Sequence, residues 1–193
     1  MPDSSPGPTP AWVPRASPPE ALVDGGVRLS RWRADDARIL DDLVVDNIDH
    51  LRPTMPWIAN EPLSLADRAA LLAEWEAAWE ARHDFDYLVR HDGEPAGSVG
   101  LHVRQGVGVL ELGYWVARKK NGLGVASAAA RLLAGAALAI EGVHAVEIHH
   151  DAYNAASGRV AVNAGFTAIS YYPRAPAAPD DSGTARRWVL LRG

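Results

Sequence analysis

A glycine-containing loop between a strand-like and a helix-like segment is the feature that most constrains the fold of this chain. The loop reads Lys119-Lys120-Asn121-Gly122-Leu123-Gly124, and an alanine-rich stretch follows it to about residue 140. Two glycines leave the backbone open to an approaching anion, and the first turn of a helix has unpaired N–H donors that point toward it. The loop therefore predicts an anion site at a helix start, with Lys119 and Lys120 adding positive charge.

The flanking patterns predict a mixed α/β fold. In chain order they predict a strand at 27–32, helices at 34–51 and 64–82, strands at 85–91, 95–104 and 109–117, a helix at 122–140, a strand at 145–150, a helix at 154–163 and strands at 166–172 and 186–191. This order predicts a mostly antiparallel central sheet flanked by about four helices. A βαβ crossover in the second half places the glycine loop at the carboxyl end of a strand, where open α/β sheets bind ligands.

The length of the chain and its proline distribution predict a tail followed by one domain. The chain has 193 residues, and seven of its 14 prolines lie in the first twenty. Prolines at this density oppose both helix and sheet. We expect residues 1–24 to be a disordered, proline-rich tail, with Trp12 as a local anchor, and residues 25–193 to form a single domain.

Composition excludes several functional classes. A net charge of −5 argues against nucleic-acid binding, and the absence of cysteine excludes thiolate sites. We find no apolar run long enough to span a membrane and no secretory signal pattern, so we expect a cytoplasmic protein. We expect no metal site at His149 and His150, because adjacent strand residues point to opposite faces.

Two other anion-binding motifs fail on context. Gly122 to Ser127 nearly matches the dinucleotide fingerprint G-x-G-x-x-G, but antiparallel strands precede it and only about seventy residues follow, too few for two nucleotide-binding halves. A P-loop would need Gly-Lys-Ser/Thr, which the loop lacks.

A set of short motifs in fixed order resembles the GNAT superfamily of N-acetyltransferases, in its RimJ/RimL-like branch. The motifs are Leu110–Val116, the K-x-x-G-x-G loop, Asn154–Ser157, Asn163–Phe166 and, upstream, Asn47–Pro53 and Met55–Trp57. The resemblance covers about residues 27–192. Lys119 departs from the usual Gln or Arg. The resemblance implies a GNAT-like fold and acetyl-CoA as co-substrate, with no metal.

The resemblance also assigns residues to the cofactor. The implied acyl-CoA contacts are Trp115, Val116, Lys119, Lys120, Asn121, Gly122, Leu123, Gly124, Val125, Ala126, Asn154 and Ser157. It places Asn154 at the pantetheine and the Ser157 hydroxyl near the thioester sulfur, although Asn154 also suits a helix N-cap. Many members have a tyrosine acid where this chain has Ala161, so Ser157, or a water that it holds, is the predicted acid.

Glu111 is the predicted base. Strand alternation puts Glu111, Gly113 and Trp115 on one face, where a carboxylate in an apolar setting should have a raised pKa. The alternative is an ion pair with a neighbouring basic residue such as Arg104. Three histidines are rivals to Glu111: His102, on the adjacent strand, His149 and His150.

The acceptor is less constrained. Trp57, in a proline-bounded loop, and His102 are the predicted substrate-side residues. The branch resemblance implies a protein N-terminal α-amine, as in ribosomal-protein modification. Acetylation or succinylation of a small-molecule or peptide amine such as an antibiotic, and a non-catalytic acyl-CoA-binding regulator, stay open, as does a homodimer.

Overall fold

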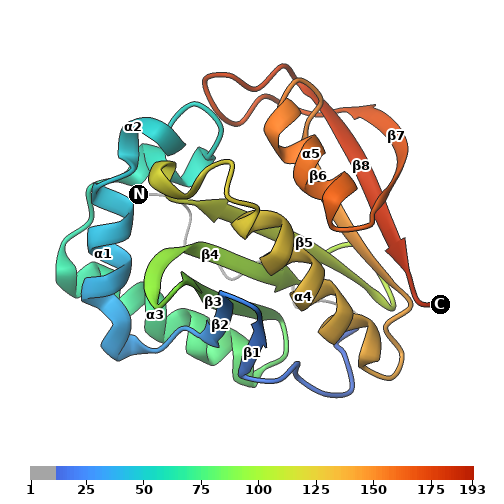
Figure 1. Ribbon diagram of the computed structural model, residues 1–193, viewed down its shortest axis with the longest axis horizontal. Helices are drawn as coiled ribbons and strands as arrows, with labels where there is room; N and C mark the ends of the chain where they lie inside the picture. Colours follow the sequence, from blue (N-terminus) through green and yellow to red (C-terminus); the bar gives the residue numbers. More distant parts are fainter. Residues whose placement is uncertain (1–11) are drawn as a thin grey trace.

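The structure is a computed structural model that describes residues 12–193 (Figure 1). Its strands are β1 (Ala21–Asp24), β2 (Val27–Arg31), β3 (Asp84–His91), β4 (Glu94–His102), β5 (Val109–Val116), β6 (Ala145–Asp151), β7 (Thr167–Pro173) and β8 (Thr184–Leu191). Its α-helices are α1 (Ala37–Val45), α2 (Ile48–Leu51), α3 (Leu65–Glu80), α4 (Val125–Ala139) and α5 (Ala155–Asn163), and short 3-10 turns cover Ala34–Asp36, Pro56–Asn60 and Arg118–Lys120.

All eight strands join one sheet in the order β1-β2-β3-β4-β5-β6-β8-β7. Every neighbouring pair is antiparallel except β5 and β6, which are parallel. Helices α4 and α5 lie on one face, while α1 and α3 cover the other (Figure 1). The predicted mixed, mostly antiparallel sheet is confirmed. No helix between residues 12 and 193 is long and apolar enough to cross a membrane.

The parallel pairing of β5 and β6 is short. Residues Val109–Glu111 pair with Ala145–Glu147, yet β5 continues to Val116 and β6 to Asp151. Beyond the third pair the two strands diverge. Beyond that point the facing backbone groups of β5 and β6 do not pair with each other, so the divergence leaves room between the two strands.

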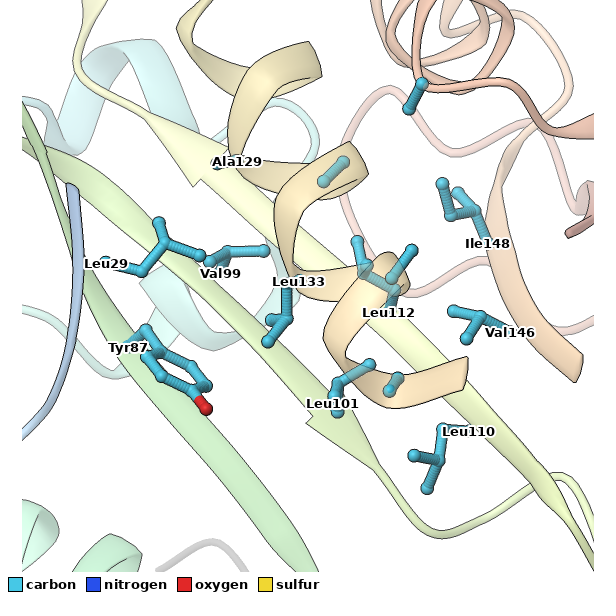
Figure 2. Packing of buried hydrophobic residues seen from close by; sticks show 14 of the residues in the cluster. Leu29, Tyr87, Val99, Leu101, Leu110, Leu112, Ala129, Leu133, Val146 and Ile148 are labelled. Carbon is cyan, nitrogen blue, oxygen red and sulfur yellow. The ribbon is translucent and has the colours of Figure 1, made fainter. Parts of the chain in front are cut away.

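Helix α4 packs on the sheet through an alanine-rich face. Small side chains let a helix approach a sheet closely, and the gaps are filled by larger residues from both sides. Figure 2 shows this core, whose labelled members are Leu29, Tyr87, Val99, Leu101, Leu110, Leu112, Ala129, Leu133, Val146 and Ile148. This packing fixes the start of α4 relative to the end of β5.

The N-terminal segment is more ordered than its composition predicts. Residues 1–11 lie outside the described part of the chain, but Trp12 packs against the core and Ala21–Asp24 form β1. The prediction of disorder through residue 24 is therefore wrong for β1. The strand is free of proline, and a Gly25-Gly26 turn, with Gly25 at φ 56°, folds it onto β2. The Tyr87 hydroxyl donates to the Pro19 carbonyl at 2.8 Å.

The predicted helix over 34–51 is divided into a 3-10 turn, α1 and α2. The break lies at Asp46 and Asn47. Asn47 is 7% exposed, and its side-chain amide donates to the Leu43 carbonyl at 2.8 Å. A buried asparagine that bonds the preceding turn competes with regular helical geometry, which accounts for the division.

Leu133→Ala should destabilise the fold by about 2–5 kcal/mol, because the Leu133 side chain of α4 is fully buried and its truncation leaves a cavity. Urea denaturation followed by circular dichroism measures the change. Leu191→Ala, at a side chain that is 65% exposed, is the control and should shift stability by less than about 0.5 kcal/mol. Equal losses in the two variants would contradict this account of the core.

Candidate active site

The start of α4 is built by two glycines with left-handed backbone. Gly122 has φ 76° and Gly124, the N-cap residue, has φ 77°. Ala128 N–H donates the first helical bond, to the Gly124 carbonyl at 3.0 Å, so the N–H groups of the first turn have no carbonyl before them in the helix. A Cβ added at either glycine would meet nothing within 4 Å, so the space before these donors is open.

This open space belongs to a cleft of about 560 Å³ between the end of β5, the start of α4 and the start of α5. Most residues assigned to the cofactor line it: Trp115, Val116, Lys120, Asn121, Gly122, Gly124, Val125, Ala126, Asn154 and Ser157. Two basic side chains that sequence reasoning missed, His50 and Arg159, also line it. Arg159 lies in the second turn of the short α5, close behind the predicted cofactor residues Asn154 and Ser157. This position in the sequence could have identified it as a residue of the cleft.

Lys119 and Leu123 do not line the cleft. Lys119 lies instead on a separate cavity with Asp42, Asp46 and Glu94. The Leu123 side chain is 57% exposed. The 3-10 turn over Arg118–Lys120 rotates successive side chains in different directions, so only one of the two lysines faces the cleft.

Asn47 ties the glycine loop to the rest of the domain. Its side-chain oxygen accepts from Arg118 N–H at 2.8 Å while its amide holds the end of α1. The structure shows that Asn47 itself braces the cofactor-side loop.

The start of α5 brings two hydroxyls together. Asn154 caps the helix, since its side-chain oxygen accepts from Ser157 N–H at 3.0 Å. The Tyr114 hydroxyl lies 2.8 Å from Ser157 Oγ and 3.1 Å from the Ser157 carbonyl oxygen. Burial raises the pKa of Tyr114 to about 12, so the phenol keeps its proton at neutral pH. Tyr114 was not among the predicted site residues, because strand alternation places its side chain on the face of β5 opposite to that of Glu111.

Glu111 is held in an ion pair. Its carboxylate accepts from Arg104 at 2.5 Å and from the Gln105 amide. Burial alone would raise the pKa of Glu111, but the Arg104 hydrogen bond and charge, with the Gln105 bond, lower it below its ordinary value. The predicted raised pKa is wrong, and the alternative of a pair with Arg104 is the arrangement found.

A second cavity, of about 590 Å³, lies on the α1 and α3 side of the sheet. Its walls are largely apolar and include Trp57, Trp75 and Trp115, with the Trp57 and Trp115 rings 5.8 Å apart. Its polar floor holds His102 and Asp86. The structure thus places both predicted substrate-side residues, Trp57 and His102, around one cavity.

His102 is oriented by a carboxylate from the neighbouring strand. Its Nδ1 lies 2.6 Å from Asp84 Oδ1. Burial lowers the pKa of His102, but the Asp84 hydrogen bond and the Asp86 charge outweigh burial and raise it. Neither aspartate was singled out from the sequence. The sequence feature that could have identified them is the pair of acids at alternate positions at the start of β3.

The cofactor-side cleft and the acceptor-side cavity meet. Met55 and Tyr114 line both, and they also line a third cleft of about 590 Å³ that includes Glu111, His149 and Ser157. A ligand that lies in the gap between β5 and β6 can therefore reach a second ligand bound on the other side of the sheet.

The two histidines of β6 are engaged in protein contacts. His149 lies 2.8 Å from Glu147 Oε2 and 2.7 Å from the Tyr172 hydroxyl, while Trp188 Nε1 donates to His150 at 2.7 Å. Within residues 12–193, no three His, Asp or Glu side chains are grouped so as to hold a metal ion.

Solved structures share this fold. RimL, the ribosomal L7/L12 alpha-N-protein acetyltransferase, in complex with coenzyme A, matches with a TM-score of 0.82 at 18% identity over 89% of this chain and 98% of its own. RimJ from Mycobacterium smegmatis, in complex with CoA-disulfide, matches at 0.79 and 19% identity over 93% and 90%. The microcin C7 self-immunity acetyltransferase MccE, with acetyl-CoA and AMP, matches at 0.79 and 16% identity over 87% and 93%.

Two comparisons based on sequence also match acetyltransferases. The relative, "Putative ribosomal N-acetyltransferase YdaF" of Bacillus subtilis (strain 168), is 26% identical over 99 residues, 51% of this chain. The match spans only about half of that relative's own length, 54%. The profile of the acetyltransferase (GNAT) domain matches residues 27–167, and the chain therefore belongs to the GNAT acetyltransferase family.

Proposed function

We propose that the protein is an N-acyltransferase that moves the acetyl group of acetyl-CoA to a primary amine. One observation carries this proposal. The cleft at the start of α4 and the acceptor-side cavity meet at Met55 and Tyr114, which line both. Bringing two substrates together in line is itself a large source of rate enhancement.

The cofactor-side residues fit the chemistry of an acyl-CoA. The N–H groups of Val125 and Ala126 and the open space at Gly122 and Gly124 suit a pyrophosphate, which the helix dipole and Lys120 also favour. The cleft then follows the free edge of β5 toward Ser157. Backbone N–H groups near Trp115–Val116 are the proposed donors to the thioester oxygen as it becomes negative.

The proposed reaction is a direct transfer. The acceptor ammonium gives one proton to a base, for which Glu111 and His102 are the candidates, and its nitrogen attacks the thioester carbonyl carbon. A C–N bond forms and the C–S bond breaks. The departing thiolate takes a proton from the hydroxyl pair of Ser157 and Tyr114, which lie 2.8 Å apart, and the amide nitrogen releases its second proton back to that pair.

We propose a protein N-terminal α-amine as the acceptor. The names of RimL and of the Bacillus subtilis relative support this class, as does the net charge of −5, which suits a basic protein partner. The test is incubation with acetyl-CoA and a panel of peptides and small amines, with free thiol and product mass measured. Tight CoA binding without thiol release from any amine would replace the enzyme by an acyl-CoA-binding regulator.

Gly122→Ala should weaken CoA binding by about tenfold, because the new Cβ occupies the open space where a phosphate would approach. Isothermal titration calorimetry with CoA measures the change. Gly142→Ala is the matched control, since Gly142 also has positive φ, at 87°, and open space, at the far end of α4. Both variants carry a similar strain of about 1 kcal/mol. Equal CoA affinities in the two would rule out the assigned pyrophosphate position.

Ser157→Ala should lower kcat by about 100-fold, the lower end for proton transfer by a positioned side chain, with CoA affinity retained. Tyr114→Phe should lower kcat as well, because it removes the hydroxyl that lies 2.8 Å from Ser157 Oγ. The double variant should be no slower than Ser157→Ala if the two hydroxyls act as one unit. Fully additive losses in stopped-flow turnover would separate their roles.

Glu111→Gln tests whether Glu111, rather than His102, is that base. A base role predicts a fall in kcat of about 100-fold with CoA affinity near that of the wild type. Gln105→Ala, which removes only one hydrogen bond to Glu111, is the control and should change kcat little. Since the pKa of Glu111 is lowered, its ionisation should produce no change of rate above about pH 5. Unchanged turnover would remove Glu111 from the mechanism.

A further inference from the structure

Strand register creates a side-chain-free strip on the acceptor face of the sheet. Asp86 pairs with Gly100, and Gly100 pairs with Gly113, so one row across β3, β4 and β5 carries a single side chain. The flanking rows are full: they are Leu88–Ser98–Trp115 on one side and Asp84–His102–Glu111 on the other. The two glycines therefore form the floor of a hollow with Asp86 at its end.

Two polar side chains, those of Asp86 and His102, lie close above this floor. A Cβ at Gly100 would collide with Asp86 Oδ1 and would lie 3.2 Å from His102 Nε2, while one at Gly113 would lie 3.6 Å from the same nitrogen. The glycines thus make room for both side chains. Among residues 12–193, Asp86 and His102 form no hydrogen bond or ion pair with each other, so a donor placed above Gly100 can reach both.

The other charges around the cavity are already paired. On the sheet, His102 bonds Asp84 and Arg104 bonds Glu111. On the opposite wall the buried Arg68 makes two bonds to Glu61, at 2.8 and 2.7 Å, and lies 3.6 Å from Asp41. Within the described chain, the Asp86 carboxylate accepts no hydrogen bond. Among residues 12–193, it is the one acidic group on this floor that a cationic ligand could pair without breaking an existing contact.

The walls above Asp86 are apolar and aromatic. Trp57, Trp75 and Trp115 contribute rings, and Leu40 and Val44 contribute aliphatic surface. Aromatic faces attract a cation and an apolar substituent alike. A second charge on the ligand would lose its hydration against these walls without a partner.

We propose that Asp86 is the acceptor-binding carboxylate and that the acceptor's primary ammonium carries an apolar aliphatic or aromatic group, which for a protein N-terminus is the side chain of the first residue. The ammonium donates to Asp86 above the Gly100–Gly113 floor, and its apolar group lies among the tryptophans. This inference rests on the proposed function, because it names the acceptor class of that same site.

His102 is the group that removes the proton in this arrangement. In neutral His102 the Asp84 carboxylate favours the tautomer with its proton on Nδ1, which leaves the lone pair on Nε2 toward the floor. One N–H proton of the ammonium passes to Nε2, the freed lone pair forms the C–N bond, and the C–S bond breaks. Asp86 keeps its charge and holds the imidazolium that results. Glu111, paired with Arg104, is then a positioning residue.

The pKa of Asp86 provides a second test of its role, through the stability of the protein. Burial raises its pKa to about 6, which the His102 and Arg104 charges oppose and the Asp84 charge assists. The folded-state pKa is above the ordinary value of 3.8, so the protonated form is favoured by folding and stability falls as pH rises through this interval. Above about pH 6 the charged group costs stability. Asp86→Asn should therefore keep or raise the melting temperature at pH 7.5, which a merely structural carboxylate would not do.

The test compares two amines of nearly the same shape on CoA-saturated protein at pH 7.5. 2-Phenylethylamine is an ammonium at this pH, whereas O-benzylhydroxylamine is neutral. By calorimetry, Asp86→Asn should weaken 2-phenylethylamine at least about tenfold, as expected for loss of a hydrogen bond to a charged group, and leave O-benzylhydroxylamine within about twofold. Asp92→Asn, at an exposed carboxylate in the β3–β4 hairpin, is the control and should change neither.

Three results would overturn the inference. They are equal Kd values for 2-phenylethylamine in the wild type and Asp86→Asn, equal weakening of both ligands, and binding of 1,4-diaminobutane as tight as that of 2-phenylethylamine. Binding and turnover are read separately. Asp86-dependent binding without thiol release would defeat the proposed enzyme while preserving this site, and thiol release with Asp86-independent binding would do the reverse.

Discussion

The arrangement of this protein depends on where the parallel pairing of β5 and β6 stops. After Glu111 and Glu147 the strands separate, although both continue. The backbone donors in a sheet interior are normally paired, so this divergence is a place where a central strand can offer N–H groups to a ligand. The starts of α4 and α5 lie on either side of it, because each helix follows one of the diverging strands. Cofactor cleft and acceptor cavity can meet only because the sheet opens here.

Much of this architecture could be predicted because it is encoded locally. The Asp92-Gly93 turn, with φ of 52° and 83°, sets the β3–β4 hairpin, and Ser64 caps α3 by accepting from Asp67 N–H. β1 escaped prediction because proline density in the preceding segment outweighed the Gly25-Gly26 turn. Its stability comes from pairing with β2, which composition does not report.

The candidate site likewise has a part that the local sequence predicts and a part that it does not. Its backbone part, the Gly122–Gly124 loop and the Asn154 cap, was predictable, since each depends on a few consecutive residues. The side-chain part was not. Whether Glu111 has a raised or lowered pKa depends on Arg104 reaching it across a turn, and alternation alone cannot decide that. Lys119 faces elsewhere because a 3-10 turn, invisible to the motif, sets its direction.

The acceptor face shows how register turns ordinary residues into a site. Gly100 and Gly113 would each weaken an isolated strand, and a carboxylate beside them would be better solvated elsewhere. Placed opposite one another next to Asp86, they leave a hollow with a charge that no neighbour in the described chain satisfies. Pairing that charge inside the protein would restore stability and fill the space. Within residues 12–193, the other acids around this cavity have basic partners and Asp86 has none, which is the arrangement expected where a ligand completes the structure.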